Sequence, residues 1–394
     1  MPTLEPGRAA GRVFIVAGEV SGDLHGAALA RELRALAPDL RLEGIGGLQM
    51  AAAGVRLVED SSTWGLMGWA EAVPHMRAFL RRLDAAASRL LADPPDVLVP
   101  VDFPGFNLRL LERLRGRIPA VYYVPPMVSV RRGRRAARVA ALGARLLAIF
   151  PFEAEAYRAA GADVTFVGHP AMDLVDGLEP AERVRARLGI PPDGPVLGLL
   201  PGSRRQELDA LLDLMLEAAR RVRAAHPHLV ILLAVASPIF RDRIGEAVAA
   251  SRLPVILADG AREVMQVSTV LLLASGTAAV EAMVLGVPMV AVYRGSWVSW
   301  MIANLVVAPR WGTIPNIMAR AEVVPELLQA RASARMMSAE VRRLLLQPEA
   351  RDAMRARLLD LASALGPPGA ARRAAAEVLA ALGRPTLKVE SAVQ

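Results

Sequence analysis

The sequence of 394 residues contains no cysteine, which excludes both a disulfide framework and a thiolate metal site. Aromatic residues make up only 4% of the chain, and we find no zinc-finger, RNA-recognition or helix-turn-helix signature. Nucleic acid is therefore the least expected partner, although the formal net charge is +8. Paired histidines or carboxylates at metal-ligand spacing are also missing, so we expect neither a metal ion nor another cofactor.

Long apolar segments are missing as well. No apolar run reaches the ~20 residues of a membrane-spanning helix, and the N-terminal lead before the first strand has no apolar signal core. We therefore expect a cytoplasmic protein, which can still attach to a membrane surface. Lys388 is the only lysine, so nearly all the positive charge is arginine. Such a basic balance fits an anionic lipid surface or phosphorylated small molecules.

Apolar sequence as such is abundant, at 54% of the chain, which is enough for a well-packed interior. Buried-strand patterns alternate with helical ones, which predicts an α/β fold made of two doubly wound Rossmann-like domains. We predict a first domain over residues 12–178, completed by helices within 351–384, and a second domain over 190–350. Ligands of such folds bind in a cleft at the carboxyl ends of the strands.

The most informative segment is a strand-to-helix turn, AGEVSGDLHG, from Ala17 to Gly26. Glycines let the backbone turn sharply beside a ligand, and helix N-termini attract anions. The expected ligand-binding residues are Gly18, Glu19, Ser21, Gly22, Asp23 and His25. Capping of the helix by Ser21 or Asp23 is an equally open interpretation of the segment alone.

Two similar turns occur in the second domain. The strand Val196–Leu200 ends in PGSRR, where Gly202, Ser203 and Arg204 combine backbone donors and a guanidinium group that suit a diphosphate. The strand Val270–Ala274 is followed by Ser275, Gly276 and Thr277, with Glu281 one helical turn further on. A carboxylate at that place can accept two ribose hydroxyls. A capped turn with solvated arginines is the alternative for the first turn, and a capping interaction of Glu281 is the alternative for the second.

Two further polar residues end strands of the first domain. Asp102 follows the strand Val97–Val101 in the motif VDFPGFN and is a general-base candidate, although capping of the next helix is the commoner role. His169 stands in the motif GHP, and for a lone histidine we favour a structural role.

Apolar side chains beside arginines mark a candidate membrane or acyl-chain contact. From Trp69 onward they recur at roughly helical spacing beside Arg77, Arg81 and Arg82. The residues concerned are Trp64, Met67, Trp69, Val73, Met76, Phe79 and Leu80. The uncharged segment 295–309 and the basic run 131–138 are similar candidates. Core packing is the default interpretation of the apolar segments, and an interfacial helix flanked by arginines is the alternative.

In order and spacing, these motifs resemble those of the lipid-A-disaccharide synthase family. The similarity rests on AGEVSGDLHG, GLMGWAEAV, VDFPGFN, FPFE, VGHP, LPGSRRQE, ASGTAAVEA, GVPMVAVYR and IPN followed by VVPELLQ. It covers the chain from Val13 to the last helix. The resemblance implies a glycosyltransferase B fold with no metal requirement, in an enzyme at the cytoplasmic face of the inner membrane of Gram-negative bacteria.

The reaction that the resemblance implies joins UDP-2,3-diacylglucosamine to 2,3-diacylglucosamine 1-phosphate with inversion, and releases UDP. The implied partners are this UDP-diacylglucosamine donor, the acylated glucosamine phosphate acceptor and an anionic membrane surface; a homo-oligomer is compatible with the sequence. Asp102 would activate the acceptor 6-hydroxyl, and Arg204 would meet the UDP diphosphate. Asn316, in the IPN motif, would lie beside the nucleotide site formed by Ser275 to Glu281.

The chain departs from the family pattern at three positions. Gly105 stands where the family has a second aspartate, and Ser129 and Arg131 replace two tryptophans. Two alternatives to the synthase stay open: a UDP-N-acetylglucosamine 2-epimerase on the same architecture, and a non-catalytic paralogue that binds nucleotide sugar or lipid. The arginine- and tryptophan-rich segments argue against the epimerase, because an epimerase meets no lipid.

Overall fold

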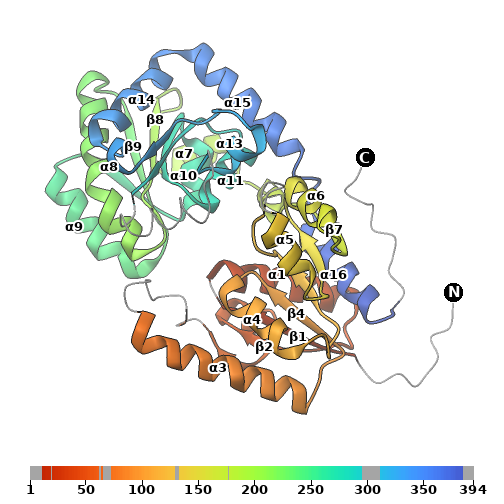
Figure 1. Cartoon of the computed structure of the whole chain (residues 1–394). Coiled ribbons are helices and arrows are strands. Elements are labelled where there is room, and N and C mark those ends of the chain that lie inside the picture. The colour runs from red at the N-terminus through yellow and green to blue at the C-terminus, as the bar shows by residue number, and fades with distance from the viewer. Residues whose placement is uncertain are drawn as a thin grey trace. The chain divides into compact units, whose positions relative to one another are not determined.

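The computed structural model describes residues 11–18, 20–61, 64, 72–128, 133–175, 177–294 and 311–384, and the side chains of Val20 and residues 72–76 are left undescribed. The chain forms two compact units, Met1–Asp173 with Leu365–Gln394, and Leu174–Ala364 (Figure 1). Each unit is built on one parallel sheet flanked by helices, which confirms the predicted α/β class. None of the described helices is both long enough and apolar enough to cross a bilayer.

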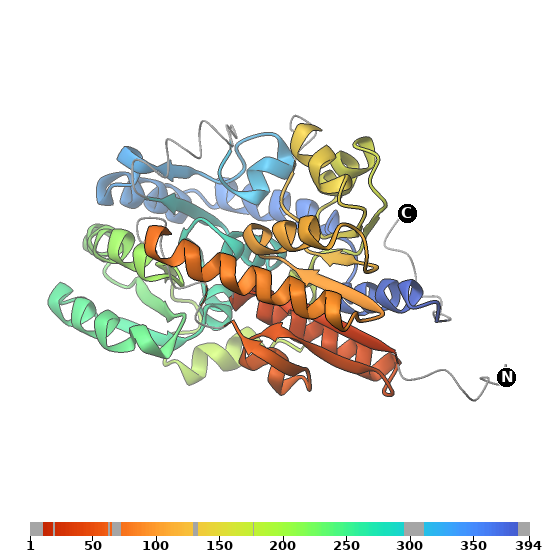
Figure 2. The ribbon, with the colours of Figure 1, turned by 60° about the horizontal axis from the view of Figure 1, so that its bottom comes forward.

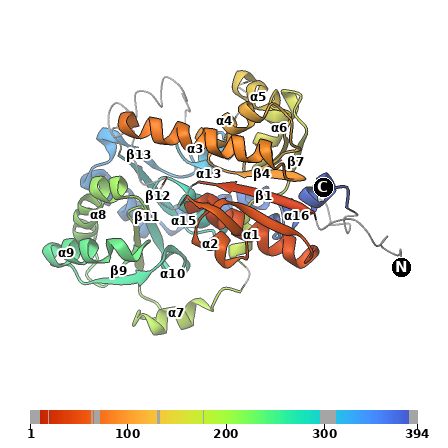
Figure 3. The same cartoon turned by 90° about the horizontal axis from the view of Figure 1, so that it is seen from below.

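The first unit has a seven-stranded parallel sheet in the order β3-β2-β1-β4-β5-β6-β7. Its strands are β1 (Arg12–Ala17), β2 (Arg41–Gly46), β3 (Arg56–Asp60), β4 (Val97–Val101), β5 (Val121–Tyr123), β6 (Arg145–Ala148) and β7 (Val164–Phe166). Its helices are α1 (Val20–Leu36), α2 (Leu48–Ala52), α3 (Ala72–Ala92), α4 (Pro104–Leu114), α5 (Gly133–Ala140), α6 (Pro151–Ala159) and α16 (Ala370–Ala381). Helices α1 and α16 pack together on one side of the sheet, and α3 and α4 on the other (Figures 2 and 3).

The second unit has a six-stranded parallel sheet in the order β10-β9-β8-β11-β12-β13. Its strands are β8 (Val196–Leu200), β9 (Val230–Val235), β10 (Val255–Asp259), β11 (Val270–Ala274), β12 (Met289–Tyr293) and β13 (Glu326–Leu328). Its helices are α7 (Ala181–Arg187), α8 (Arg205–Ala225), α9 (Arg241–Ser251), α10 (Ala261–Val267), α11 (Thr277–Val284), α13 (Ile314–Ala319), α14 (Ala334–Leu346) and α15 (Pro348–Ser363).

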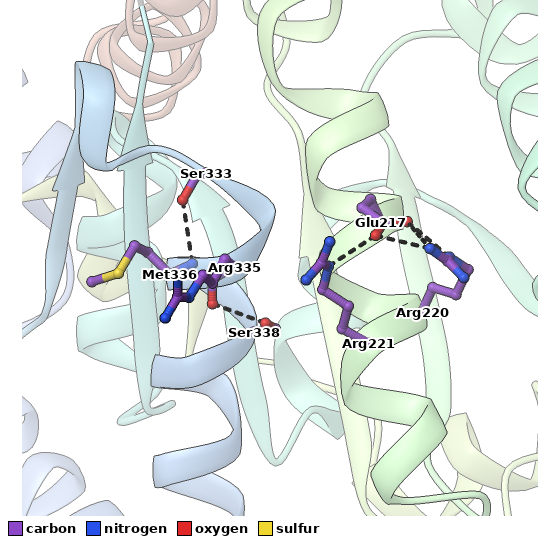
Figure 4. Close-up of polar contacts among 7 residues, drawn as sticks. All are labelled: Glu217, Arg220, Arg221, Ser333, Arg335, Met336 and Ser338. Carbon is purple, nitrogen blue, oxygen red and sulfur yellow. Dashed lines mark hydrogen bonds and ion pairs between the residues drawn. The ribbon is translucent and has the colours of Figure 1, made fainter.

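Helices α8 and α14 of the second unit pack against each other and on β11. Ser333 caps α14, because its hydroxyl accepts a hydrogen bond from the Met336 N–H at 3.3 Å (Figure 4). On α8, the Glu217 carboxylate bridges Arg220 and Arg221, which lie three and four residues further along the helix. Such exposed pairs add only a few tenths of a kcal/mol each, so the apolar faces of the helices supply most of the packing energy.

The division of the C-terminal helices corrects the predicted boundaries. We expected residues 351–384 to complete the first unit, but α15 packs on α11 and α14 of the second unit, where the Met289 N–H donates to Met354 Sδ. Only the chain from Leu365 onward returns, and α16 packs on α1. The N-terminal part of the first unit ends at Asp173, close to the predicted residue 178.

Candidate active site

The strand order reverses once in each sheet, between β1 and β4 in the first and between β8 and β11 in the second. At such a point the loops that follow neighbouring strands diverge and leave a crevice at the carboxyl ends, where open α/β folds bind ligands. The turns singled out from the sequence follow these four strands. Each unit therefore carries the predicted polar residues at its own switch point.

Asp102 follows β4 and is held by a neighbour across the first switch point. The Ser21 hydroxyl, from the start of α1, donates to Asp102 Oδ2 at 2.9 Å. Asp102 and Phe103 both adopt left-handed backbone, with φ of 49° and 48°. Non-glycine residues in this region are strained, and such residues gather at functional sites. The capping alternative for Asp102 is not favoured, because Phe103 occupies the N-cap position of α4.

The main chain of Asp102 is also fixed by two side chains that sequence reasoning did not select. Its carbonyl oxygen accepts hydrogen bonds from the Tyr122 hydroxyl and from Asn107 Nδ2, both at 2.8 Å. Asn107 is fully buried, and Tyr122 lies inside β5. In the sequence Tyr122 reads as part of an apolar strand, and only the pairing of β4 with β5 brings it to Asp102.

The glycines of the first turn allow close packing of backbone and side chains. A Cβ on Gly18 would lie 2.0 Å from the Phe103 ring, and one on Gly22 would lie 3.4 Å from the Val101 carbonyl oxygen. Phe103 in turn stacks on Phe106, with ring centroids 5.7 Å apart. The loop that carries Asp102 therefore requires glycine at position 18, independently of any contact that Gly18 makes with a ligand.

Asp23 has a structural task that accounts for its carboxylate. It accepts the N–H groups of Gly47, Gln49 and Met50 at 2.8–3.0 Å, which caps α2. The capping alternative is thus supported for Asp23, although the helix capped is α2 and not its own. Glu19 lies outside the described residues.

Two buried histidines of the first unit, His25 and His169, have lowered pKa values. Burial lowers the pKa of His25, while the charge of Asp102 opposes this shift, and the ring packs edge-on against Tyr123 at 6.1 Å. Burial, with a smaller contribution from His25, lowers the pKa of His169 to about 3. His169 Nδ1 accepts the Ala171 N–H at 3.0 Å. These contacts support the structural role that we favoured for His169.

At the second switch point, a carboxylate occupies backbone donors that we expected to be open. Glu207 Oε2 accepts the N–H groups of Ser203 at 2.9 Å and Arg204 at 3.3 Å. Gly202, with φ 115°, makes this approach feasible, since a Cβ there would lie 2.3 Å from that oxygen. The expectation of free donors was therefore wrong, because α8 is capped by its own Glu207. The Arg204 side chain remains 69% exposed.

Helix α11 places the other predicted nucleotide residues. Gly276 and Thr277 are exposed at its start, and the Ser275 hydroxyl donates to the Gly312 carbonyl oxygen at 3.2 Å. Burial raises the pKa of Glu281, and the charge of Arg262 opposes this shift. Within the described part of the chain, no side chain or backbone group donates a hydrogen bond to the Glu281 carboxylate, so its oxygens remain compatible with hydroxyl donors of a ligand.

Asn316 belongs to the scaffold beneath this turn. It is fully buried, and its amide makes four hydrogen bonds: to the Val324 carbonyl and Glu326 Oε1, and from the N–H groups of Val323 and Val324. Glu326 also accepts from the N–H groups of Gly312 and Thr313 at 2.8 and 2.9 Å. Direct ligand contact by Asn316 is not favoured, because its hydrogen-bonding groups are already used. Instead it fixes the Gly312 turn that holds Ser275.

The structure describes only some residues of the candidate membrane segment, and these differ in burial. Trp64 and Phe79 are partly buried against the first core, at 5.2 and 5.6 Å from the Phe106 ring, which supports core packing for these two. Leu80 is 37% exposed on α3 beside exposed Arg81. Met67, Trp69 and the segment 295–309 lie outside the described residues, as do the side chains of Val73 and Met76 and residues 129–132.

No group of three or more His, Asp or Glu in the described ranges is placed to hold a metal ion.

The two parallel-sheet units, each with one switch point, place this chain in the glycosyltransferase B fold class. The structure is similar to UDP-GlcNAc 2-epimerase from Neisseria meningitidis, with a TM-score of 0.63 and 12% identity over 94% of this chain and 99% of that one. A putative UDP-N-acetylglucosamine 2-epimerase from Listeria monocytogenes gives 0.62 and 15% over 95% and 96%. At such identities the likeness establishes the fold alone.

Sequence comparison establishes the family. A model of the lipid-A-disaccharide synthetase family matches residues 13–374. The lipid-A-disaccharide synthases of Myxococcus xanthus (strain DK1622) and Geobacter sulfurreducens are 39% and 38% identical over 93% and 95% of this chain and 97% and 98% of theirs. The chain belongs to the lipid-A-disaccharide synthetase family, whose members are glycosyltransferases of lipid A biosynthesis. The epimerase alternative is not favoured.

Proposed function

We propose that this protein is an inverting glycosyltransferase that condenses UDP-2,3-diacylglucosamine with 2,3-diacylglucosamine 1-phosphate to give lipid A disaccharide 1-phosphate and UDP. The carrying observation is Asp102, which stands at the first switch point on strained backbone with its carboxylate held by Ser21 at 2.9 Å. Membership of the lipid-A-disaccharide synthetase family supports the identity proposed for the two substrates. A strained, polar strand end is where a fold places a reacting group rather than a core residue.

In the proposed reaction the Asp102 carboxylate takes the proton of the acceptor 6-hydroxyl. The acceptor oxygen then forms a bond to the anomeric carbon while the bond from that carbon to the UDP diphosphate breaks, so a single displacement inverts the centre. Arg204 meets the departing diphosphate, and Glu281 accepts ribose hydroxyls. We propose that these protein groups serve the transfer without a metal ion.

The reaction is tested with purified protein, both acylated substrates and EDTA in the buffer. Mass spectrometry should detect the disaccharide 1-phosphate in step with UDP release, and the anomeric proton coupling should show inversion. Epimerised UDP-N-acetylglucosamine as the product would support the epimerase alternative. UDP binding without any transfer would support the non-catalytic paralogue. A rate that collapses in EDTA and returns with magnesium would refute the metal-free proposal.

Replacing Arg204 by alanine is expected to weaken UDP binding by roughly 1.5–3 kcal/mol, the range of a charge-assisted hydrogen bond. The side chain is largely exposed at the switch-point turn, so its loss should leave the fold intact. Isothermal calorimetry measures the effect. Arg205→Ala is a matched control, because Arg205 stands next in the chain and is 81% exposed beside Asp209. Equal losses in both variants would contradict a specific role for Arg204.

We also propose that the protein binds peripherally to the cytoplasmic face of the inner membrane of Gram-negative bacteria. Leu80 and Arg81 on α3 combine an exposed apolar side chain with a cation, as an interfacial helix requires.

Replacing Leu80 by glutamate is expected to lower the fraction of protein that floats with phosphatidylglycerol-containing vesicles, and to leave UDP binding unchanged. The cause is the loss of apolar contact and added repulsion from the anionic headgroups. Leu359→Glu, on α15 of the second unit where Leu359 is 43% exposed, controls for the surface charge change. Equal flotation of wild type and Leu80→Glu would remove α3 from the docking surface.

A further inference from the structure

The Asp102 carbonyl oxygen is the meeting point of two buried donors. Tyr122 Oη from β5 and Asn107 Nδ2 from α4 each lie 2.8 Å from it. Asn107 Nδ2 also lies 3.3 Å from the carbonyl oxygens of Val16 and Val101, the strand residues on either side of the switch point. The Asp102 N–H completes the set by donating to the Tyr123 carbonyl at 3.0 Å.

These bonds act on a backbone that would otherwise relax. A non-glycine residue in the left-handed region costs of order 1 kcal/mol or more, and Asp102 and Phe103 adopt it in succession. Such a conformation persists only where the surroundings over-determine it. The direction of the Asp102 side chain depends on this φ, so groups that hold the carbonyl also aim the carboxylate.

Tyr122 is suited to be a permanent donor. It is fully buried, and burial together with the charge of Asp102 raises the pKa of its hydroxyl well above the usual value. The hydroxyl therefore keeps its proton throughout the working pH range and donates to the Asp102 carbonyl rather than to substrate. This makes it a positioning group, not a group that touches the reacting atoms.

We propose that Tyr122 and Asn107 are positioning residues for glycosyl transfer. By holding the Asp102 carbonyl oxygen, they keep the Asp102 carboxylate in line with the acceptor hydroxyl. The inference rests on the proposed role of Asp102 as the base. A misplacement of a reacting group by about 1 Å can cost on the order of a hundredfold in rate, so one lost hydrogen bond at this carbonyl has a measurable effect.

The test is a double-mutant cycle with Tyr122→Phe, which removes only the hydroxyl, and Asp102→Asn. We expect Tyr122→Phe to lower kcat roughly ten- to hundredfold with the KM for the UDP-sugar within about twofold. In the Asp102→Asn background the same change should cost less than about twofold, because a residue that acts through Asp102 has nothing left to position. Equal fold-losses in both backgrounds, or an unchanged kcat for Tyr122→Phe, would overturn the proposal.

Tyr157→Phe is the matched structural control. Tyr157 is also a buried tyrosine whose hydroxyl donates to a backbone carbonyl, but to that of Pro126 and not to that of Asp102. It should lower the melting temperature as much as Tyr122→Phe does and leave kcat within about twofold, since a lone hydrogen bond has a similar worth at both places. A kcat loss in this control as large as in Tyr122→Phe would assign the effect to stability. Full activity of Asp102→Asn would instead refute the proposed function itself.

Discussion

Replacing Asp102 by asparagine is expected to lower kcat for glycosyl transfer by about two to four powers of ten, while UDP binds as it does to the wild type. Asparagine has nearly the same shape and can still accept the hydrogen bond that Ser21 now donates to Oδ2. It cannot take a proton from the acceptor hydroxyl. The change therefore removes the base and leaves the turn at the first switch point in place.

The matched control is Asp60→Asn, at the carboxyl end of the edge strand β3. That position ends a parallel strand of the same sheet, but away from the switch point, so kcat should stay within about twofold. Initial rates of UDP release measure turnover, and calorimetry with UDP reports on the nucleotide site. Near-normal turnover of Asp102→Asn would remove Asp102 from the base role.

The sequence allowed prediction of where the polar turns lie better than of the contacts that their residues make. Buried apolar runs such as Val97–Val101 identified the central strands, and the polar residue after each run identified the switch-point turns. Ser21 and Asp102 were both selected, yet their hydrogen bond depends on β1 lying beside β4. Strand order is a property of the whole sheet, and no local pattern in the chain encodes it.

Long-range caps were the other feature that local patterns could not show. Asp23 reads as a cap of its own helix, but it binds N–H groups 24–27 residues further along the chain. Glu326 of the short strand β13 likewise fixes the Gly312–Thr313 turn and Asn316, which precede it in the chain. In each case an acidic or amide side chain satisfies buried donors in a segment that folds against it, and tertiary structure alone brings the two together.

Replacing Arg373 by methionine is expected to lower the free energy of unfolding of the first unit by about 3 kcal/mol. Arg373 on α16 is 9% exposed, and its guanidinium donates to the carbonyl oxygens of Val167, Pro367 and Pro368 at 2.6–2.8 Å. It also lies against Gly168, whose φ is 82°, in the GHP motif. The side chain thereby ties the returning C-terminal segment to the end of β7. Methionine fills much of the volume but leaves the carbonyl of Val167 without its donor.

Burial lowers the pKa of Arg373, and the charge of Asp173 opposes this shift, so the site holds the cation against a desolvation cost. A methionine recovers that cost only in part, because the carbonyl oxygens remain arranged around a donor. Thermal melts and hydrogen exchange of residues 365–384 measure the change, and α16 should lose protection first. Arg372→Met is the matched control. The Arg372 side chain, next in the chain to Arg373, is 51% exposed beside Glu32, and such a surface ion pair contributes at most about 1 kcal/mol. Equal melting of the two variants would show that α16 is held by its apolar face on α1 and not by the guanidinium.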